Sequence, residues 1–566
     1  MGITVLGIHD GHGAGAALIR DGQVISAIQE ERLTNIKNFT GVPVLAISEV
    51  FKIANIDPSE VDAIAIGCLV RVNAPVAEED KFSVQFYKKI APLLRGHLAT
   101  NLLIKSFHSV RKIDDLKKVF EEIGIEKKEL IFVEHHASHA ACAYYQRPWD
   151  DNTLVLTLDG AGDGISATVN VGCDTHIERI ASTTSYNSPG NNLYSEITGY
   201  LGMKRWEHEY KVMGMAPYGI PEQCMDQMRQ IIRINPKKPL EFQNTLGAYS
   251  TEVQKKLQRL LAGKRFDNIS AACQRYYEEL VTQWVRNAIQ ATGIHKIACS
   301  GGMFLNVKAN KLIRELPEVE ATFFYPAADD SGTPVGAALE GYYHFCENKR
   351  IKSCHSSLTD LYYGREFSDD EIEQSLVEKG WRNQAERIEN FEDNIAELLS
   401  QGKVIARFTG RDEWGPRALG NRSIMADPRD LRIIRRINFA IKYRDFWMPF
   451  APSILEEDMQ VYLKDAHSAP YMIEAFDTLK KAYELIASLH PYDRTARPQV
   501  VNSWNPSWRS IIEKFRDRTG VGGILNTSFN LHGYPIVGSP EIALQTFENS
   551  DLDGLVLGKW FVQRKS

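Results

Sequence analysis

The sequence is poor in cysteine and has no long hydrophobic run. Its eight cysteines are scattered through 566 residues without a C-x-x-C pair, which excludes the dense disulfide framework of a small secreted domain. It has no stretch of about 18 consecutive apolar residues, as a membrane-spanning helix would require. The first residues, MGITVLGIHDG, lack a basic leader followed by an apolar stretch. We therefore expect a cytoplasmic protein with reduced thiols and no membrane partner.

Positive charge is not in excess either. The 66 Lys and Arg residues face 72 Asp and Glu residues, which gives a formal net charge of -6. Proteins that hold nucleic acids by counterion release need a basic surface, so we do not expect a nucleic-acid partner. The composition, 43% hydrophobic and 24% charged, is that of a folded globular protein. Because one hydrophobic core rarely extends beyond about 250 to 300 residues, we expect two domains.

One short pattern occurs twice in the first half of the chain. Asp10-Gly-x-Gly-x-Gly and Asp159-Gly-x-Gly-x-Gly each lie between two short apolar runs. An Asp-Gly turn by itself is an ordinary β-hairpin signal. Two copies in the same register indicate an internal duplication instead, and such turns let a phosphate approach the backbone N–H groups closely. The repeat predicts a two-lobed nucleotide-binding fold.

Strand-like and helix-like segments alternate through both halves of the chain, which predicts an α/β class. Residues 251–292 carry a long helical pattern, and HKIACS (residues 295–300) has the composition of a strand. The polar stretch ENKRIKSCHSSLTD, residues 347–360, has no periodic apolar positions. We place the domain boundary there, with an amino-terminal domain at 1–350 and a carboxy-terminal α/β domain at 357–566.

Three histidines lie within five residues, in VEHHASHAA. His135 and His139 are separated by one helical turn and would share a face, so two imidazoles can bind one metal ion. Packed histidines behind a helix cap are the alternative. Asp159 and Asp330 are the candidate carboxylate ligands, although Asp330 also suits a helix N-terminus. Two imidazoles with carboxylates form a mixed nitrogen and oxygen set that suits Fe(II), Mn(II) or Zn(II).

Two glycine-rich segments of the first half are candidate phosphate or ribose sites. Ser300-Gly301-Gly302, followed by Asn306, lies between a predicted strand and a helix, where a helix N-terminus favours an anion. Lys211 begins KVMGMAPYG and is either a phosphate contact or a surface lysine beside a turn.

The second half supplies a group of cations. Arg417 lies in GPRALGNRS, Lys442 and Arg444 form a K-x-R pair, and Arg497 follows further along the chain. Arginine side chains suit small planar anions because they form two parallel hydrogen bonds. A solvated surface is the alternative, but the neighbouring Trp, Pro and Phe residues favour an anion pocket.

Nine motifs, in this order, resemble those of the NodU/CmcH family of O-carbamoyltransferases, which modify nodulation oligosaccharides, cephems and aminoglycosides. The similarity spans essentially the whole chain. The motifs are EERL near residue 30, HHASHAA, LDGAGDG, KVMGMAPYG, SGGMFLN, DDSGTPVGAAL, GPRALGNRSIMADPR, KYRDFWMPFAPSIL and LNTSFN.

The resemblance implies a duplicated actin/sugar-kinase-like (ASKHA) domain, followed by a YrdC-like α/β domain. It implies that carbamoyl phosphate and ATP, with Mg²⁺, form carbamoyladenylate in the second domain. The carbamoyl group is then transferred to a hydroxyl of a small acceptor in the first domain. Fe(II) or a similar ion would bind there to the metal ligands His135, His139, Asp159 and Asp330.

Further residue roles follow from the same resemblance. The adenosine would lie near Ser300, Gly301, Gly302 and Asn306. Carbamoyl phosphate and ATP would be bound by Lys442, Arg444, Ser528 and Asn530, with Arg417 and Arg497 as further cations. Relatives often have Arg and Glu at the positions of His532 and Tyr534 here, so an extra cation at that place is not expected.

The residue that activates the acceptor is predicted less directly. Asp10 or His12, on the first hairpin, is our candidate general base, and Lys37 a cation near the transferring carbonyl. Hydrogen bonding within the turn is the alternative for His12.

Two other functions compete: threonylcarbamoyladenosine-type modification of tRNA, which the acidic net charge disfavours, and ATP binding without catalysis. A homodimer is the base-rate expectation for the assembly.

Overall fold

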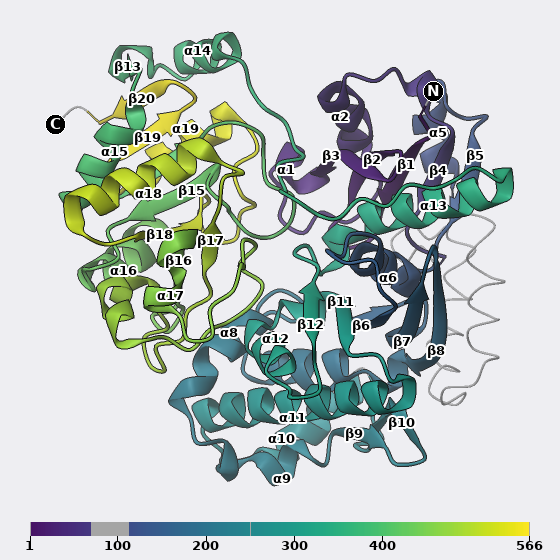
Figure 1. The fold of residues 1–566 in the computed structure, drawn as a ribbon. Coiled ribbons are helices and arrows are strands. Elements are labelled where there is room, and N and C mark those ends of the chain that lie inside the picture. Colours follow the sequence, from purple (N-terminus) through teal and green to yellow (C-terminus); the bar gives the residue numbers. More distant parts are fainter. Residues whose placement is uncertain (1, 70–112, 250, 565–566) are drawn as a thin grey trace. The chain divides into compact units, whose positions relative to one another are not determined.

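The computed structural model describes residues 2–69, 113–249 and 251–564 (Figure 1). The chain divides into two compact units. The first consists of Met1–Glu30 and Phe39–Thr359, and the second of Glu31–Asn38 and Asp360–Ser566. The sequence placed the division between residues 350 and 357 and did not anticipate that a segment from the first forty residues would belong to the second unit.

The first unit contains two sheets with the same topology. In each sheet, three consecutive strands form an antiparallel meander, and two further strands extend its first strand in parallel. The first sheet has the order β3-β2-β1-β4-β5 and the second β12-β11-β6-β7-β8. The duplication predicted from the repeated Asp-Gly turns is confirmed, since both turns join the first two strands of their sheet.

The bounds of these strands follow. They are β1 (Thr4–His9), β2 (Gly15–Arg20), β3 (Gln23–Gln29), β4 (Ala63–Ile66), β5 (Glu129–Phe132), β6 (Thr153–Gly162), β7 (Ile165–Cys173), β8 (His176–Thr184), β11 (Lys296–Ser300) and β12 (Ala321–Phe324). A separate hairpin consists of β9 (Ile232–Asn235) and β10 (Lys238–Asn244).

Two helices pack between these sheets. Helix α13 (Thr333–Lys349) contacts β1, and α6 (His135–Tyr145) contacts β6 and β11 (Figure 1). Gly336 allows α13 and α6 to pack closely, because a Cβ at this position would lie only 1.9 Å from the carbonyl oxygen of Ser138. Every residue of α6 except Ala137 is buried. The histidines of α6 are therefore held in the interior of the unit.

The other helices lie around the sheets. They are α2 (Val44–Ala54), α5 (Asp114–Glu122), α7 (Glu196–Tyr200), α8 (Glu209–Met215), α9 (Met225–Met228), α10 (Thr251–Leu260), α11 (Phe266–Thr292) and α12 (Val307–Arg314). The long helical pattern of residues 251–292 thus forms two helices rather than one. Gly263, with φ +73°, lies between them in a left-handed conformation that ends a helix.

The second unit is built on one mixed sheet with the order β13-β20-β19-β14-β15-β18-β16-β17. Its strands are β13 (Ala385–Arg387), β14 (Ile405–Phe408), β15 (Arg422–Ala426), β16 (Ala451–Leu455), β17 (Gln499–Val501), β18 (Gly523–Ser528), β19 (Gly554–Leu557) and β20 (Trp560–Gln563). Helices α15 (Phe391–Ser400) and α18 (Pro506–Thr519) belong to one apolar core, and α14 (Asp369–Glu378) and α19 (Pro540–Glu548) to another. The predicted α/β class is confirmed.

Among the described residues, no helix is both long and apolar enough to cross a membrane.

Glu340, on α13, predicts a pH dependence of stability for the first unit. Burial raises the pKa of its carboxyl group to about 7, although Tyr145 hydrogen-bonds to it. Since the folded state then holds a proton that the unfolded chain releases, stability falls as the pH rises from about 4.5 to about 7. Glu340→Gln is expected to remove this loss, which is on the order of 3 kcal/mol.

Urea denaturation of both proteins at pH 5 and pH 8 measures this effect. The free energy of unfolding of Glu340→Gln, relative to that of the unsubstituted protein, should increase from pH 5 to pH 8. Glu122→Gln, at an exposed position of α5 in the same unit, is the control and should show no such increase. Equal pH dependence of Glu340→Gln and the unsubstituted protein would show that Glu340 ionises normally.

Candidate functional site

Four side chains that the sequence predicted as metal ligands lie together in the first unit. The ligand atoms of His135, His139, Asp159 and Asp330 are all within 4.8 Å of one another. Nε2 of His135 lies 3.1 Å from Nε2 of His139 and 3.4 Å from Oδ1 of Asp330. Nε2 of His139 lies 3.5 Å from the same carboxylate oxygen. This is a compact arrangement of two imidazoles and two carboxylates.

The local structure explains how these four residues meet. His135 and His139 are one turn apart on α6, whose N-terminus is capped by the Glu134 side chain. Asp159 follows the apolar part of β6, where the strand reaches the hairpin turn. The helix cap expected as an alternative for Asp330 is provided by its neighbour Asp329, which accepts a hydrogen bond from the backbone of Ser331. The Asp330 carboxylate is thus left to face the histidines.

The electrostatics of the cluster favour a positive charge at its centre. Burial lowers the pKa of His135, but the carboxylates of Asp330 and Asp159 outweigh it and raise this pKa to about 10. Burial raises the pKa of Asp159, but the hydrogen bond to His135 and the charges of the neighbouring histidines together lower it below its ordinary value. Oδ1 of Asp330 is buried and accepts no hydrogen bond from the described residues. The donor set and its inward orientation fit a divalent cation.

His136 is different from the other two histidines of the motif. Its Nδ1 lies 2.8 Å from the hydroxyl oxygen of Thr157, and burial lowers its pKa to about 3. His136 is therefore a neutral, packed histidine, which is the role that the sequence offered as the alternative for the whole motif.

Asp163, in the second hairpin turn, also holds this region in place. Its carboxylate accepts hydrogen bonds from the backbone N–H groups of His135, at 2.8 Å, and Leu69, at 2.9 Å. Sequence reasoning assigned no role to Asp163, because nothing local shows that its carboxylate reaches the first residue of α6.

The segment predicted to bind adenosine contacts the same cluster. The Ser300 hydroxyl lies 3.3 Å from Nδ1 of His139, and the backbone N–H of Gly302 donates to Asp159 over 2.9 Å. Gly301 has φ +109°, and a Cβ there would lie 2.4 Å from a backbone oxygen. Asn306 caps α12. Lys211 is buried on α8, so the surface-lysine alternative does not apply.

The first hairpin places its polar residues differently from our expectation. Asp10 is buried and accepts a hydrogen bond from the thiol of Cys68, whereas His12 is exposed and pairs through its backbone with Thr40. His9, which the sequence analysis did not select, is 3% exposed, and its ring centroid lies 6.1 Å from that of His135. Neither ring nitrogen of His9 has a hydrogen-bond partner in the described part of the chain.

A signal for His9 was present in the repeat. When Asp10 is aligned with Asp159, His9 falls on Leu158. The other copy has a buried leucine at this position, so the strand does not need a histidine there in order to fold. His9 could therefore have been selected as a candidate site residue.

The second unit brings the predicted K-x-R and S-x-N residues together. Lys442 is buried, and its ammonium group lies 3.1 Å from the Ser528 hydroxyl and 2.6 Å from Oδ1 of Asn530. Arg444 donates to Asn438 and lies over the ring of Phe450, 4.2 Å from its centroid.

Further cations surround this group. Burial, together with the nearby charges of Arg444 and Lys37, lowers the pKa of Lys442. Burial, Arg417 and Arg444 likewise lower the pKa of Arg497, and Nη1 of Arg497 is buried without a hydrogen bond from the described residues. Like charges that depress one another's protonation in this way are stabilised when an anion lies between them.

The sequence analysis assigned Lys37 to the transfer site of the first domain, and that assignment remains a prediction. The structure groups Lys37 with the second unit, close enough to Lys442 to lower the pKa of that lysine. The reason is that the chain leaves the first unit after Glu30 and returns to it at Phe39.

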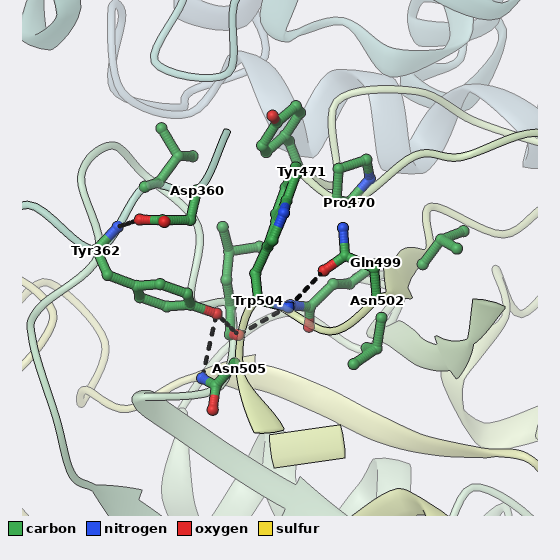
Figure 2. A pocket seen from close by; sticks show the side chains of 12 residues that line it. Asp360, Tyr362, Pro470, Tyr471, Gln499, Asn502, Trp504 and Asn505 are labelled. Atoms are coloured by element: carbon green, nitrogen blue, oxygen red, sulfur yellow. Dashed lines mark hydrogen bonds between the residues drawn. The ribbon is translucent and has the colours of Figure 1, made fainter. Parts of the chain in front are cut away.

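A separate small pocket lies in the second unit (Figure 2). The rings of Tyr471 and Trp504 stack at 5.9 Å beside it, and Asn505 donates a hydrogen bond to the hydroxyl of Tyr362. Gln499 donates to the backbone of Leu419. No residue predicted from the sequence as a site residue lines this pocket.

Comparisons with known proteins match both units. The family described as "Carbamoyltransferase N-terminus" matches residues 4–339, and "Carbamoyltransferase C-terminus" matches residues 396–564. The nodulation protein NolNO of Sinorhizobium fredii is 34% identical over 99% of this chain and 79% of its own length. A 3'-hydroxymethylcephem-O-carbamoyltransferase of Amycolatopsis lactamdurans is 26% identical over 76% of this chain and 80% of its own.

Similarities to solved structures are more distant. Component A of (R)-2-hydroxyglutaryl-CoA dehydratase from Acidaminococcus fermentans has a TM-score of 0.33 and 15% identity, covering 61% of this chain and 99% of its own. HypF from T. kodakarensis has a TM-score of 0.34 and 12% identity, covering 62% of this chain and 49% of its own.

Proposed function

Because the chain belongs to the carbamoyltransferase family across both of its units, we propose that it is an ATP-dependent O-carbamoyltransferase with one active site in each unit. The transferase class follows from the family. The division of the reaction into two steps rests on one observation: the described residues gather a metal-type cluster in the first unit and a cation-rich anion site in the second.

In the proposed first step, the second unit makes carbamoyladenylate. Carbamoyl phosphate is hydrolysed to carbamate and phosphate, and a carbamate oxygen then attacks the α-phosphorus of ATP and displaces pyrophosphate. Negative charge builds up on the phosphate oxygens during this attack. Lys442, Arg444 and Arg497, with Mg²⁺ on the triphosphate, would stabilise that charge because they are fixed before the substrate arrives.

In the proposed second step, an acceptor hydroxyl attacks the carbonyl carbon of carbamoyladenylate in the first unit, and AMP leaves. His135, His139, Asp159 and Asp330 would hold Fe(II) or a similar divalent ion, which supplies a Lewis acid for the phosphate oxygens of the adenylate. The adenosine would lie beside Gly301 and Gly302, whose backbone adjoins the cluster through the hydrogen bond from Gly302 N–H to Asp159.

The proton of the acceptor hydroxyl needs a base. Of the polar residues on the first hairpin, we propose His9. Burial lowers its pKa despite the raising effect of Asp330, so that its imidazole is neutral and can accept a proton. His12 is exposed and pairs through its backbone with Thr40, and the Asp10 carboxylate already accepts a hydrogen bond from Cys68.

A small hydroxyl-bearing natural product is the proposed acceptor, since the related cephem enzyme is named for such a substrate. The net charge of -6 argues against tRNA. A non-catalytic ATP-binding role would leave the buried cations of the second unit and the cluster of the first without a purpose.

Acceptor screening tests this function. The full chain is incubated with ATP, carbamoyl phosphate, Mg²⁺ and Fe(II), together with aminoglycosides, chito-oligosaccharides, hydroxymethylcephems or tRNA. Mass spectrometry should detect the addition of one carbamoyl group to a small acceptor, dependent on both ATP and carbamoyl phosphate. Transfer without ATP, or transfer to tRNA alone, would contradict the proposal.

A further inference from the structure

The segment Glu31–Asn38 is an integral part of the second unit although it is encoded between strands of the first. Arg32 lies in this segment, on the short helix α1 (Glu30–Thr34), and its side chain is only 2% exposed. The segment packs closely on the rest of the unit at Gly538, where a Cβ would lie 1.8 Å from the carbonyl oxygen of Arg32. Such a close fit indicates that the segment has a fixed position in the second unit.

The guanidinium of Arg32 bonds to the loop that carries Arg417. Its Nη2 donates to the carbonyl oxygen of Gly415 over 2.8 Å, and its Nε lies 3.8 Å from Oδ2 of Asp412. Asp412 is itself buried, with its side chain 5% exposed. Removal of Arg32 would therefore take one of two cations from the buried Asp412 carboxylate, whose Oδ1 also lies 3.9 Å from Nε of Arg422, and would release a carbonyl two residues before Arg417.

The rest of this loop is held from its other end. Oε1 of Glu413 accepts hydrogen bonds from the backbone N–H groups of Leu419, at 2.9 Å, and Asn421, at 2.7 Å. Gly415 has φ +96°, a conformation that a glycine adopts easily and leaves easily. The bond from Arg32 fixes the loop at this otherwise adaptable residue.

The far end of the same segment also belongs to the anion site, since the charge of Lys37 acts on Lys442. We propose that Arg32 is a positioning residue of the anion site: by bonding to Gly415 and pairing with Asp412 it sets the loop from which Arg417 reaches the anion. This inference deepens the proposed function and rests on it for the identity of the anion. The second unit then requires residues 31–38 for its half-reaction.

A double-mutant cycle in the full chain tests this role, with inorganic pyrophosphate as the probe and its Kd measured by titration calorimetry. Arg32→Met is expected to weaken pyrophosphate binding about 30-fold, the value of a lost charged hydrogen bond. Arg417→Ala should have a similar effect, and the double variant should bind no more weakly than Arg417→Ala alone, because Arg32 acts through Arg417. Effects that multiply would overturn the proposal, as would unchanged binding by Arg32→Met.

Two further variants keep the test informative. Arg32→Lys retains a buried cation but can reach only one of the two partners, Gly415 or Asp412, so we expect an intermediate loss of pyrophosphate affinity. This variant provides the test if Arg32→Met does not fold. Binding by Arg32→Lys equal to that of the unsubstituted protein would overturn the proposal. Arg20→Ala, which removes a half-exposed ion pair with Glu60 in the first unit, is the control and should leave the Kd unchanged.

The same proteins separate this inference from the proposed function. Carbamoyl-phosphate-dependent exchange of pyrophosphate into ATP is measured in parallel with pyrophosphate binding. If the unsubstituted protein binds pyrophosphate in an Arg32-dependent way but catalyses no exchange, the positioning role stands and the proposed first step fails. If it exchanges normally and Arg32→Met does so too, the positioning role fails and the proposed function stands.

Discussion

Replacing His139 with alanine is expected to lower carbamoyl transfer to the acceptor by about a thousandfold and to leave carbamoyladenylate formation within about twofold of its normal rate. His139 contributes one of the four ligand atoms of the cluster, and its Nε2 lies 3.1 Å from that of His135. The cations proposed to act on ATP belong to the other unit. Transfer is measured as carbamoylated acceptor, and adenylate formation as carbamoyl-phosphate-dependent exchange of pyrophosphate into ATP.

The control for this substitution is His344→Ala. His344 is exposed on α13, where it bonds to Asn348 of the next turn, and its loss should affect neither rate. His139→Ala should also reduce the Fe(II) bound per chain. If it lowers pyrophosphate exchange as much as transfer, while the protein remains folded, the two steps do not occur at separate sites.

Arg497→Ala is expected to slow carbamoyladenylate formation and to leave carbamoyl transfer unaffected. Its Nη1 is buried without a hydrogen bond from the described residues, so it can donate to an anion. The charge of that anion would offset burial, Arg417 and Arg444, which lower the pKa of Arg497. The loss of one such fixed cation should slow adenylate formation by a factor of about 100 to 1,000. Arg444→Ala should have a larger effect and abolish this step. Transfer from carbamoyladenylate supplied from outside should be unaffected in both variants.

Arg432→Ala is the matched control, since the Arg432 side chain is 91% exposed and pairs with Asp430 at the surface. It should leave both steps unchanged. Normal pyrophosphate exchange in a folded Arg497→Ala protein would exclude Arg497 from the adenylating site.

Much of the fold could be predicted from local pattern. The repeated Asp-Gly turns reveal the duplication because each turn is specified by its own few residues. The same holds for the short apolar runs of β11 and β18. The break between α10 and α11 was missed because a long amphipathic pattern continues on both sides of the short connection 261–265, in which Gly263 has a positive φ.

The candidate site could be predicted where spacing alone brings residues together. His135 and His139 share a helix face at i and i+4, and Asp159 follows a buried strand. His9, Asp163 and Arg32 could not be found in this way, because each acts on residues far along the chain. The grouping of Lys37 with the second unit was not predicted for the same reason: a crossing of the chain between two units at residues 30 and 39 leaves no local signal.

The most direct test of two half-reactions in two units uses the His139→Ala protein in a rapid-quench experiment with carbamoyl phosphate and ATP labelled at its α-phosphate. We predict that labelled carbamoyladenylate accumulates on mixing, that pyrophosphate is released with it, and that little carbamoylated acceptor forms. An absence of any labelled adenylate, in a protein that still consumes carbamoyl phosphate, would contradict the two-step reaction.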